Sequence, residues 1–166
     1  MQLLTNRIRQ YLDQNDIPYK RIPHRRDVTA RQTAADCHLK PGDFAKVVGL
    51  NSDGAQILAV LPADHYIDVP RFKDLLGAGH LELLHEDAMA TFFPDCETGA
   101  CPPLGNLYGL TVYVAPILSK HEMITFNAGT HEEAIQMSYA EFKKLVQPIE
   151  MDFAFPSVDF SEAKAK

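Results

Sequence analysis

Gly99-Ala100-Cys101-Pro102-Pro103-Leu104-Gly105 is the segment around which the other patterns of this chain are arranged. Its two consecutive prolines exclude it from the interior of a helix or a central strand, because each lacks an N–H and has a fixed φ. The flanking glycines allow backbone angles and close approaches that a side chain would forbid. The segment therefore predicts a stiff loop. Such a loop is either a rigid turn between strands or a set of backbone N–H donors that face a ligand.

The length and composition are those of one globular domain. The chain has 166 residues, of which 46% are hydrophobic and 23% are charged, which is ordinary for a globular protein. No apolar run approaches the ~20 residues of a membrane span, and residues 1–7 lack the apolar core of a secretory signal. We therefore expect a cytoplasmic protein that does not enter the membrane.

The cysteines do not indicate a disulfide framework, because there are only three of them. The spacing of Cys96 and Cys101 fits half of a zinc site, but no second pair of ligands follows. The sequence thus predicts no metal site and no other cofactor.

Charge is distributed unevenly along the chain. The net charge is −6, yet residues 1–50 carry nine Lys or Arg against five Asp or Glu. Arg25, Arg26 and Arg31 lie in this basic part, and a local basic patch on an acidic protein can bind phosphates. The alternative is an ordinary solvated charged face.

Periodicity and capping signals predict an α+β (mixed α/β) fold. Helices are expected over 3–15, 30–39, 70–77, 85–93 and 139–146, and strands over 44–50, 55–61, 80–84, 110–114, 123–127 and 134–137. Thr29 with Gln32, and Ser138 with Glu141, have the spacing of helix-capping pairs. Residues 149–166 are expected to form a loosely packed tail.

Lys46 stands out within the strand expected over 44–50. Strand alternation places it on the same face as Phe44, Val48 and Leu50. A lysine on an apolar face is costly unless it reaches water or meets an anion. Two interpretations follow: a lysine that snorkels from the sheet, or a lysine that binds an anionic group at a site.

Four segments in this order resemble the YbaK/ProX family of aminoacyl-tRNA deacylases. They are 44–50, 58–63, 99–105 and 126–131, and the resemblance covers roughly residues 5–148. It implies a curled, barrel-like mixed β-sheet with surrounding helices. It also implies a deacylase domain over residues 1–148, followed by a tail over 149–166.

The resemblance also implies an activity. The family hydrolyses the ester that links a wrong amino acid to the 3′-terminal adenosine of tRNA, so we expect a free-standing trans-editing enzyme. Its partners would be mischarged tRNA and, as a further candidate, an aminoacyl-tRNA synthetase. The alternative is a non-catalytic module on the same fold that binds a tRNA end or a small ligand.

The resemblance assigns roles to individual residues. Lys46 occupies the position of the family's site lysine, where it would hold a phosphate or ribose of the terminal adenosine or aid the oxyanion. The backbone of Gly99 and Gly105 would stabilise that oxyanion. The residues expected to line the substrate pocket are His24, Val48, Leu61, Ala63, Ala100, Cys101, Pro102, Pro103, Gly129 and His131, and those expected to meet nucleic acid are Arg25, Arg26 and Arg31.

Two alternatives remain open for these residues. Cys101 and His131 could form a nucleophilic thiol pair, although the family's loop does not require a cysteine at this position. His24 could be purely structural, as a lone histidine usually is.

Overall fold

The computed structural model describes residues 2–27 and 29–157, with side chains described from Arg7 onward. Its larger sheet has five strands in the order β5-β2-β3-β6-β9. These strands are β2 (Ala45–Ser52), β3 (Ala55–Pro62), β5 (Leu81–Leu83), β6 (Thr111–Val114) and β9 (Ile149–Glu150). β2 pairs antiparallel with β3 and with β5, whereas β6 pairs parallel with both β3 and β9. The sheet is therefore mixed.

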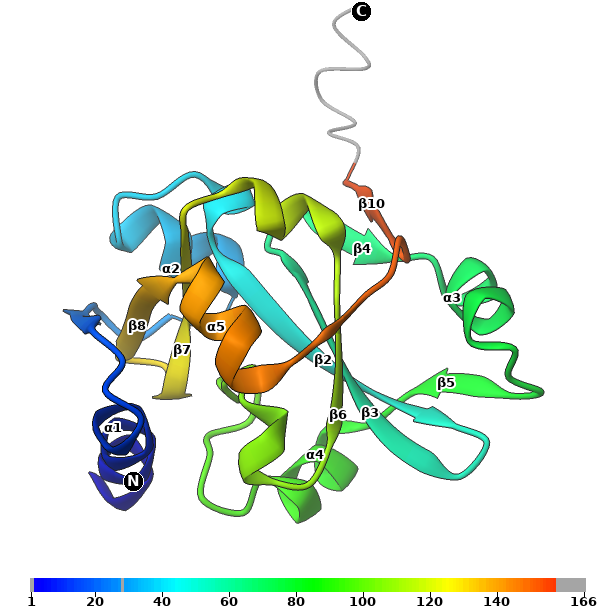
Figure 1. The fold of residues 1–166 in the computed structure, drawn as a ribbon, viewed down its shortest axis with the longest axis horizontal. Helices are drawn as coiled ribbons and strands as arrows, with labels where there is room; N and C mark the ends of the chain where they lie inside the picture. The colour runs from blue at the N-terminus through cyan, green and yellow to red at the C-terminus, as the bar shows by residue number, and fades with distance from the viewer. Residues whose placement is uncertain (1, 28, 158–166) are drawn as a thin grey trace, which may run out of the picture.

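Two smaller antiparallel sheets complete the strand content. One has the order β1-β8-β7 and the other pairs β10 with β4. Their strands are β1 (Tyr19–Pro23), β4 (His65–Ile67), β7 (Met123–Thr130), β8 (Glu133–Ser138) and β10 (Ala154–Pro156). A single parallel bridge between Phe44 and Thr125 joins the start of β2 to β7. The described strands thus form three sheets, and they do not close into one barrel (Figure 1).

Short helices surround the sheets (Figure 1). The α-helices are α1 (Gln2–Gln14), α2 (Ala30–Asp36), α3 (Val69–Leu76), α4 (Glu86–Phe92) and α5 (Tyr139–Val146), and the 3-10 turns are η1 (Pro41–Asp43), η2 (Gly105–Leu107) and η3 (Pro116–Lys120). Helix α1 packs against β7, and α5 packs against β7 and β8. The mixed α+β class predicted from the sequence is confirmed.

The capping signals are confirmed in atomic detail. The Thr29 side chain accepts a hydrogen bond from the Gln32 backbone, and the Gln32 side chain reciprocates, which starts α2. The Ser138 side chain accepts from the Glu141 N–H and starts α5. Helix α2 ends at Asp36, three residues before the expected end.

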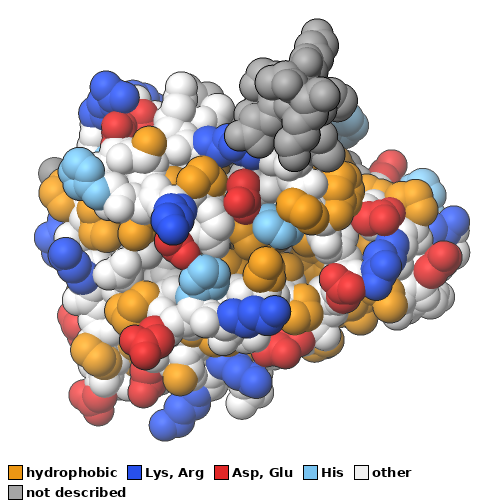
Figure 2. Space-filling model, turned by 90° about the horizontal axis from the view of Figure 1, so that it is seen from above, with side chains coloured by type: hydrophobic (Ala, Val, Ile, Leu, Met, Phe, Trp, Pro, Cys, Tyr) orange, Lys and Arg blue, Asp and Glu red, His pale blue; other side chains and the backbone are white. Residues whose placement is uncertain are grey.

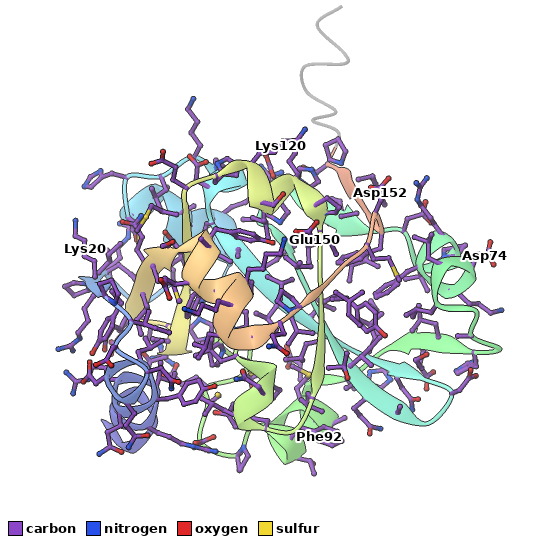
Figure 3. All side chains as sticks on the ribbon, in the orientation of Figure 1. Lys20, Asp74, Phe92, Lys120, Glu150 and Asp152 are labelled. Carbon is purple, nitrogen blue, oxygen red and sulfur yellow. The ribbon has the colours of Figure 1, made fainter. Side chains whose placement is uncertain are left out.

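The described residues form three apolar core clusters, and side chains fill the space between the elements (Figure 3). The largest cluster includes Ile8, Leu58 and Phe126 from α1, β3 and β7. A second lies on the other face of β3 and includes Leu50, Leu61 and Phe153. Strand β3 is therefore buried on both faces.

The expectation of a loosely packed tail is wrong for residues 149–157. β9 pairs with β6, β10 pairs with β4, and Phe153 between them is fully buried. The Phe153 ring stacks on Phe72 of α3 with centroids 4.5 Å apart. The prediction failed because two- and three-residue strands carry too little pattern to be recognised. The rest of the expected tail, 158–166, lies outside the described residues.

Candidate active site

Lys46 is half-buried on β2, on the same face as Val48 and Leu50, as its alternation predicted. Its Nζ lies 4.9 Å from the centroid of the Tyr66 ring, which is a cation–π distance. Burial, and then the nearby Arg31 guanidinium, lower the pKa of the Lys46 amine, while Asp64 opposes the shift. The amine is therefore a poorly solvated cation close to an aromatic face.

The loop over residues 94–105 is fastened to the end of β7. The Glu97 N–H donates to the Gly129 carbonyl, and the Gly129 N–H donates to the Ala100 carbonyl, both at 2.9 Å. A turn between them is closed by the Ala100 N–H and the Glu97 carbonyl at 3.0 Å. Gly99 sits in this turn with φ of 83°, in the left-handed region that favours glycine. The predicted stiff loop is present.

The N–H groups of Gly99 and Cys101 are among those of this loop that have no hydrogen-bond partner in the described structure. Gly99 is exposed at the surface, whereas Cys101 is buried just behind it. The loop therefore presents backbone donors of the kind that stabilise an oxyanion.

A cavity of about 150 Å³ separates this loop from β2. It is lined by Val47, Val48, Gly49, Leu84, Glu86, Met89, Thr98, Gly99 and Cys101. It exists because β5 pairs with β2 only from Leu50 to Ser52, so no described strand covers the outer edge of β2 from Ala45 to Val48. The cavity brings together the predicted residues Val48, Gly99 and Cys101. Lys46 adjoins it on β2, but its amine lies on the Tyr66 side.

His131 holds the loop in place. It is buried, and its Nε2 lies 2.6 Å from the Thr98 carbonyl oxygen, so Nε2 carries the proton and donates. Its Nδ1 is buried and finds no hydrogen-bond partner among the described residues. Because Nε2 donates to a carbonyl, Nδ1 keeps the basic lone pair, but among the described residues no hydrogen bond joins it to Cys101.

His24 is also buried, in the segment that joins β1 to α2. Its Nδ1 lies 2.7 Å from the Arg25 carbonyl and 3.5 Å from the Asp27 carboxylate. The backbone N–H groups of His24 and Asp27 donate to the carbonyls of Glu132 and His131. The segment that contains His24 is therefore hydrogen-bonded to the segment that contains His131.

The remaining predicted pocket residues are placed in the core. Leu61 lies opposite Lys46 in the β2–β3 register, and Ala63 packs with Phe44 in the third cluster. Pro102 and Pro103 are buried. None of these four lines the 150 Å³ cavity.

Gly105 is placed where packing alone explains a glycine. A Cβ at this position would lie 2.6 Å from Val112 Cγ2 and 2.7 Å from the Leu110 carbonyl oxygen. Its own carbonyl accepts hydrogen bonds from Tyr108 and Leu110. Gly105 thus lies away from the cavity that Gly99 lines.

The three predicted nucleic-acid residues differ in their surroundings. Arg25 pairs with Asp36, and Arg26 pairs with Glu97 of the loop, each at 2.7 Å. Arg31 hydrogen-bonds the Ser157 hydroxyl and lies close enough to Lys46 to affect its pKa. The face seen from above intermixes cationic, acidic and apolar side chains and shows no continuous basic patch (Figure 2).

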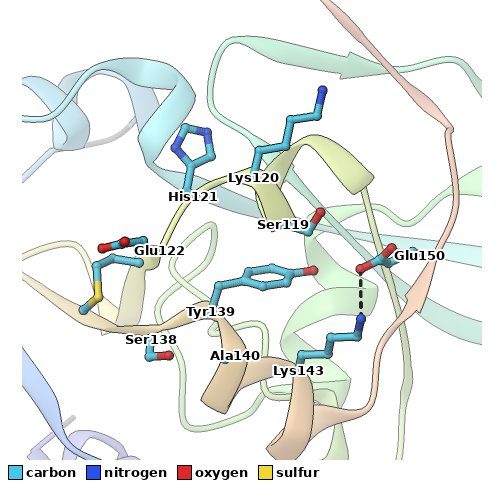
Figure 4. A pocket seen from close by; sticks show the side chains of 10 residues that line it. Ser119, Lys120, His121, Glu122, Ser138, Tyr139, Ala140, Lys143 and Glu150 are labelled. Carbon is cyan, nitrogen blue, oxygen red and sulfur yellow. Dashed lines mark ion pairs between the residues drawn. The ribbon is translucent and has the colours of Figure 1, made fainter.

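A wider groove of about 810 Å³ lies elsewhere, between η3 and α5 (Figure 4). Tyr139 lies within it, and burial, with Glu150 beside it, raises the pKa of its phenol to about 12. Lys143 and Glu150 form an ion pair at 3.6 Å along one side. The groove contains none of the predicted site residues.

Among the described residues, no group of three or more His, Cys, Asp or Glu side chains is arranged to hold a metal ion. No helix in that part of the chain combines the length and the apolar character that crossing a membrane requires.

Residues 24–145 match the aminoacyl-tRNA editing domain. The chain belongs to the aminoacyl-tRNA editing domain family. This match confirms the resemblance seen in the sequence, and it includes Lys46, the 94–105 loop and His131. No curated protein matches the chain significantly.

Several solved structures share the fold of this editing domain. Hypothetical protein APE2540 is 15% identical with a TM-score of 0.81, over 89% of this chain and 99% of that one. A proposed trans-editing enzyme for prolyl tRNA synthetase is 16% identical with a TM-score of 0.77, over 90% and 95%. A proposed signal transduction protein from Marinobacter aquaeolei VT8 is 20% identical with a TM-score of 0.68, over 93% of this chain and 31% of that one. At such identities the likeness shows the fold alone.

Three residues with unusual contacts or burial were not identified as candidates from the sequence. Tyr66 lies under the Lys46 amine, and Met89 of α4 packs onto Gly49, where a Cβ would meet its sulfur at 2.2 Å. Asn127 has a buried side-chain oxygen without a hydrogen-bond partner among the described residues. Asn127 lies two residues after Thr125, and Lys46 lies two residues after Phe44. Phe44 and Thr125 are the two residues that form the parallel bridge. Of these three residues, only Asn127 could have been found from the sequence, because a buried amide within an apolar strand is unusual.

Proposed function

We propose that this editing domain is a deacylase that hydrolyses the ester of mischarged aminoacyl-tRNA. The observation that carries the proposal is the pair of unengaged N–H groups of Gly99 and Cys101 beside the cavity at the β2 edge. Preorganised backbone donors are worth most where negative charge develops during acyl transfer, and one such donor contributes about 3 kcal/mol. The family match supports the same chemistry at the level of substrate class.

In this mechanism the protein positions and stabilises, and water is the nucleophile. Water adds to the ester carbonyl, whose oxygen becomes an oxyanion held by the Gly99 and Cys101 N–H groups. The intermediate then collapses, the bond to the ribose oxygen breaks, and that oxygen takes a proton originating from the attacking water. The products are the free amino acid and deacylated tRNA.

Lys46 would act on the nucleotide and not on the oxyanion. Its amine lies over the Tyr66 ring and outside the cavity lining. A poorly solvated cation in this position gains by meeting a phosphate or a ribose oxygen of the terminal adenosine. The lowered pKa of Lys46 reflects the same lack of solvation.

A nucleophilic Cys101 is disfavoured. Its contact with the Cys96 thiol and its burial raise the pKa of Cys101 well above the ordinary value, so the thiolate is scarce. Cys101→Ala should therefore keep most of the single-turnover rate. Loss of hydrolysis in Cys101→Ala with charged-tRNA binding intact would support a thiol mechanism instead.

The proposal is tested by turnover on a panel of mischarged tRNAs. The cavity of about 150 Å³ is smaller than a typical ligand pocket, so small aminoacyl groups should be released faster than aromatic ones. Binding of charged tRNA without release of any amino acid would favour the non-catalytic module. A tRNA substrate would be consistent with a cytoplasmic location, and the synthetase that mischarges the tRNA is a candidate partner.

A further inference from the structure

Two exposed aromatic rings lie side by side on the small β4–β10 sheet. Tyr66 and Phe155 are direct partners in its register, with ring centroids 6.0 Å apart. They are 55% and 44% exposed, and among the described residues they are the only aromatic side chains of the large exposed hydrophobic set. Core packing does not explain the presence of either ring. The aromatic residue of this segment that packs against α3 is the buried Phe153.

Cations flank this aromatic pair. The Lys46 Nζ lies 4.9 Å from the Tyr66 centroid. Arg31 hydrogen-bonds Ser157, two residues beyond Phe155 in the chain. Exposed rings accompanied by Lys and Arg are the combination by which proteins bind unpaired nucleotides, because the rings stack on bases and the cations meet the phosphates.

The pair also lies at the right place for a nucleotide attached to the acyl group. Val47 and Val48, which line the cavity, directly follow Lys46 on β2. The Lys46 amine lies against the Tyr66 ring. One strand thus separates the cavity from the aromatic pair. In an aminoacyl ester, the base of the terminal adenosine is joined to the acyl group through a single ribose.

We propose that Tyr66 and Phe155 form a stacking platform for the unpaired 3′-terminal bases of tRNA. The inference rests on the proposed function for the identity of the RNA, but not for the chemistry of the platform. An apolar protein partner is a poorer match, because it would bury the Lys46 and Arg31 charges that border the rings. In this arrangement Lys46 contacts the Tyr66 ring of the platform and also binds the nucleotide that carries the ester.

Fluorescence tests the platform without any turnover. The chain contains no tryptophan, so Phe155→Trp introduces a single indole into the platform. Titration with the RNA tetranucleotide ACCA should quench its emission saturably, because a stacked base quenches indole. Ile149→Trp is the matched control: Ile149 is 45% exposed on β9, which β3 and β6 separate from β2 in the larger sheet, and the emission of this variant should not change. Equal or absent quenching in the two variants would overturn the proposal.

Kinetics tests the platform in the intact reaction. Phe155→Ala should raise KM for charged tRNA about ten-fold with kcat nearly unchanged, which is the size expected for one lost base stack. Ile149→Ala, on the opposite edge of the larger sheet, should match the wild type. An unchanged KM in Phe155→Ala overturns the platform. Quenching by ACCA in a protein that deacylates no tRNA would instead keep the platform and reject the proposed function.

Discussion

At Lys46, a charge is held where the fold solvates it poorly. Burial and Arg31 lower the pKa of the amine below its usual 10.5, so the folded state binds the proton more weakly than the unfolded chain. The penalty is complete below the folded-state pKa and is relieved as pH rises through it toward 10.5. Lys46→Met should therefore raise Tm at neutral pH, and its advantage over the wild type should shrink toward pH 10.5 in calorimetry.

The same variant should lose most of its deacylation activity, so stability and activity move in opposite directions. A Tm advantage that does not depend on pH would mean that the methionine merely packs better. A lower Tm would mean that the Tyr66 ring more than compensates the buried charge.

The pattern of alternation was sufficient to place Lys46 on the face of Val48 and Leu50. It could not supply Tyr66, because β4 reaches that position by pairing with β10. Nor could it separate Gly99 from Gly105, which flank the same motif. One needs its left-handed backbone, and the other needs its missing Cβ.

At the scale of the loop, these two glycines should fail differently when mutated. Gly99→Ala meets no clash, since its Cβ would lie 3.4 Å from the His131 ring, but it costs about 1–2 kcal/mol in the left-handed region and should displace the donors. Activity should fall at temperatures where the variant is folded. Gly105→Ala should lower Tm, at a cost of about 1–3 kcal/mol for overpacking, while the folded fraction keeps its kcat.

Gly109 provides the matched control for the loop. It has φ of 70° and open space around its Cα, so Gly109→Ala carries a similar backbone strain outside the site. Thermal melts and single-turnover rates of the three variants separate the cases. If Gly109→Ala loses as much activity as Gly99→Ala, the effect is general strain and the donor role is wrong.

The C-terminal strands should contribute strongly to stability. Phe153 is fully buried and stacks on Phe72, so Phe153→Ala should cost about 3–5 kcal/mol of unfolding free energy. Phe155→Ala, two residues further on the same segment and 44% exposed, should cost far less. Denaturant melts of both variants measure the difference. Equal losses would mean that the segment acts through its backbone pairing alone.

The longer helices and strands were predictable because each carries several periodic residues and, for α2 and α5, a capping pair. β9 and β10 were not, since their positions depend on distant partners.

For the whole molecule, the net charge of −6 makes the local arrangement of cations decisive for tRNA binding. Arg25 and Arg26 are each neutralised by a carboxylate, whereas Arg31 borders Lys46. Arg31→Ala should therefore reduce the slope of log Kd against log salt by about 0.7, the value for one contact to a single-stranded phosphate. Arg25→Ala should leave the slope nearly unchanged. The opposite ranking would move the phosphate contacts to the Arg25 side.

The α+β class followed from the order of helices and strands along the chain. The barrel-like closure did not, because sheet order depends on pairings between distant segments. The basic patch was read from local composition, which counts Arg25 and Arg26 but not their partners, Asp36 and Glu97.

The uncovered edge of β2 between Ala45 and Val48 has a consequence for how copies of this protein meet. Free peptide groups along a strand edge pair readily with any extended chain, and such pairing begins aggregation. The 94–105 loop stands in front of this edge, fastened by the Arg26–Glu97 ion pair and the His131–Thr98 hydrogen bond. We therefore expect the loop that lines the pocket also to shield this edge, so that loosening it for faster substrate entry would favour aggregation.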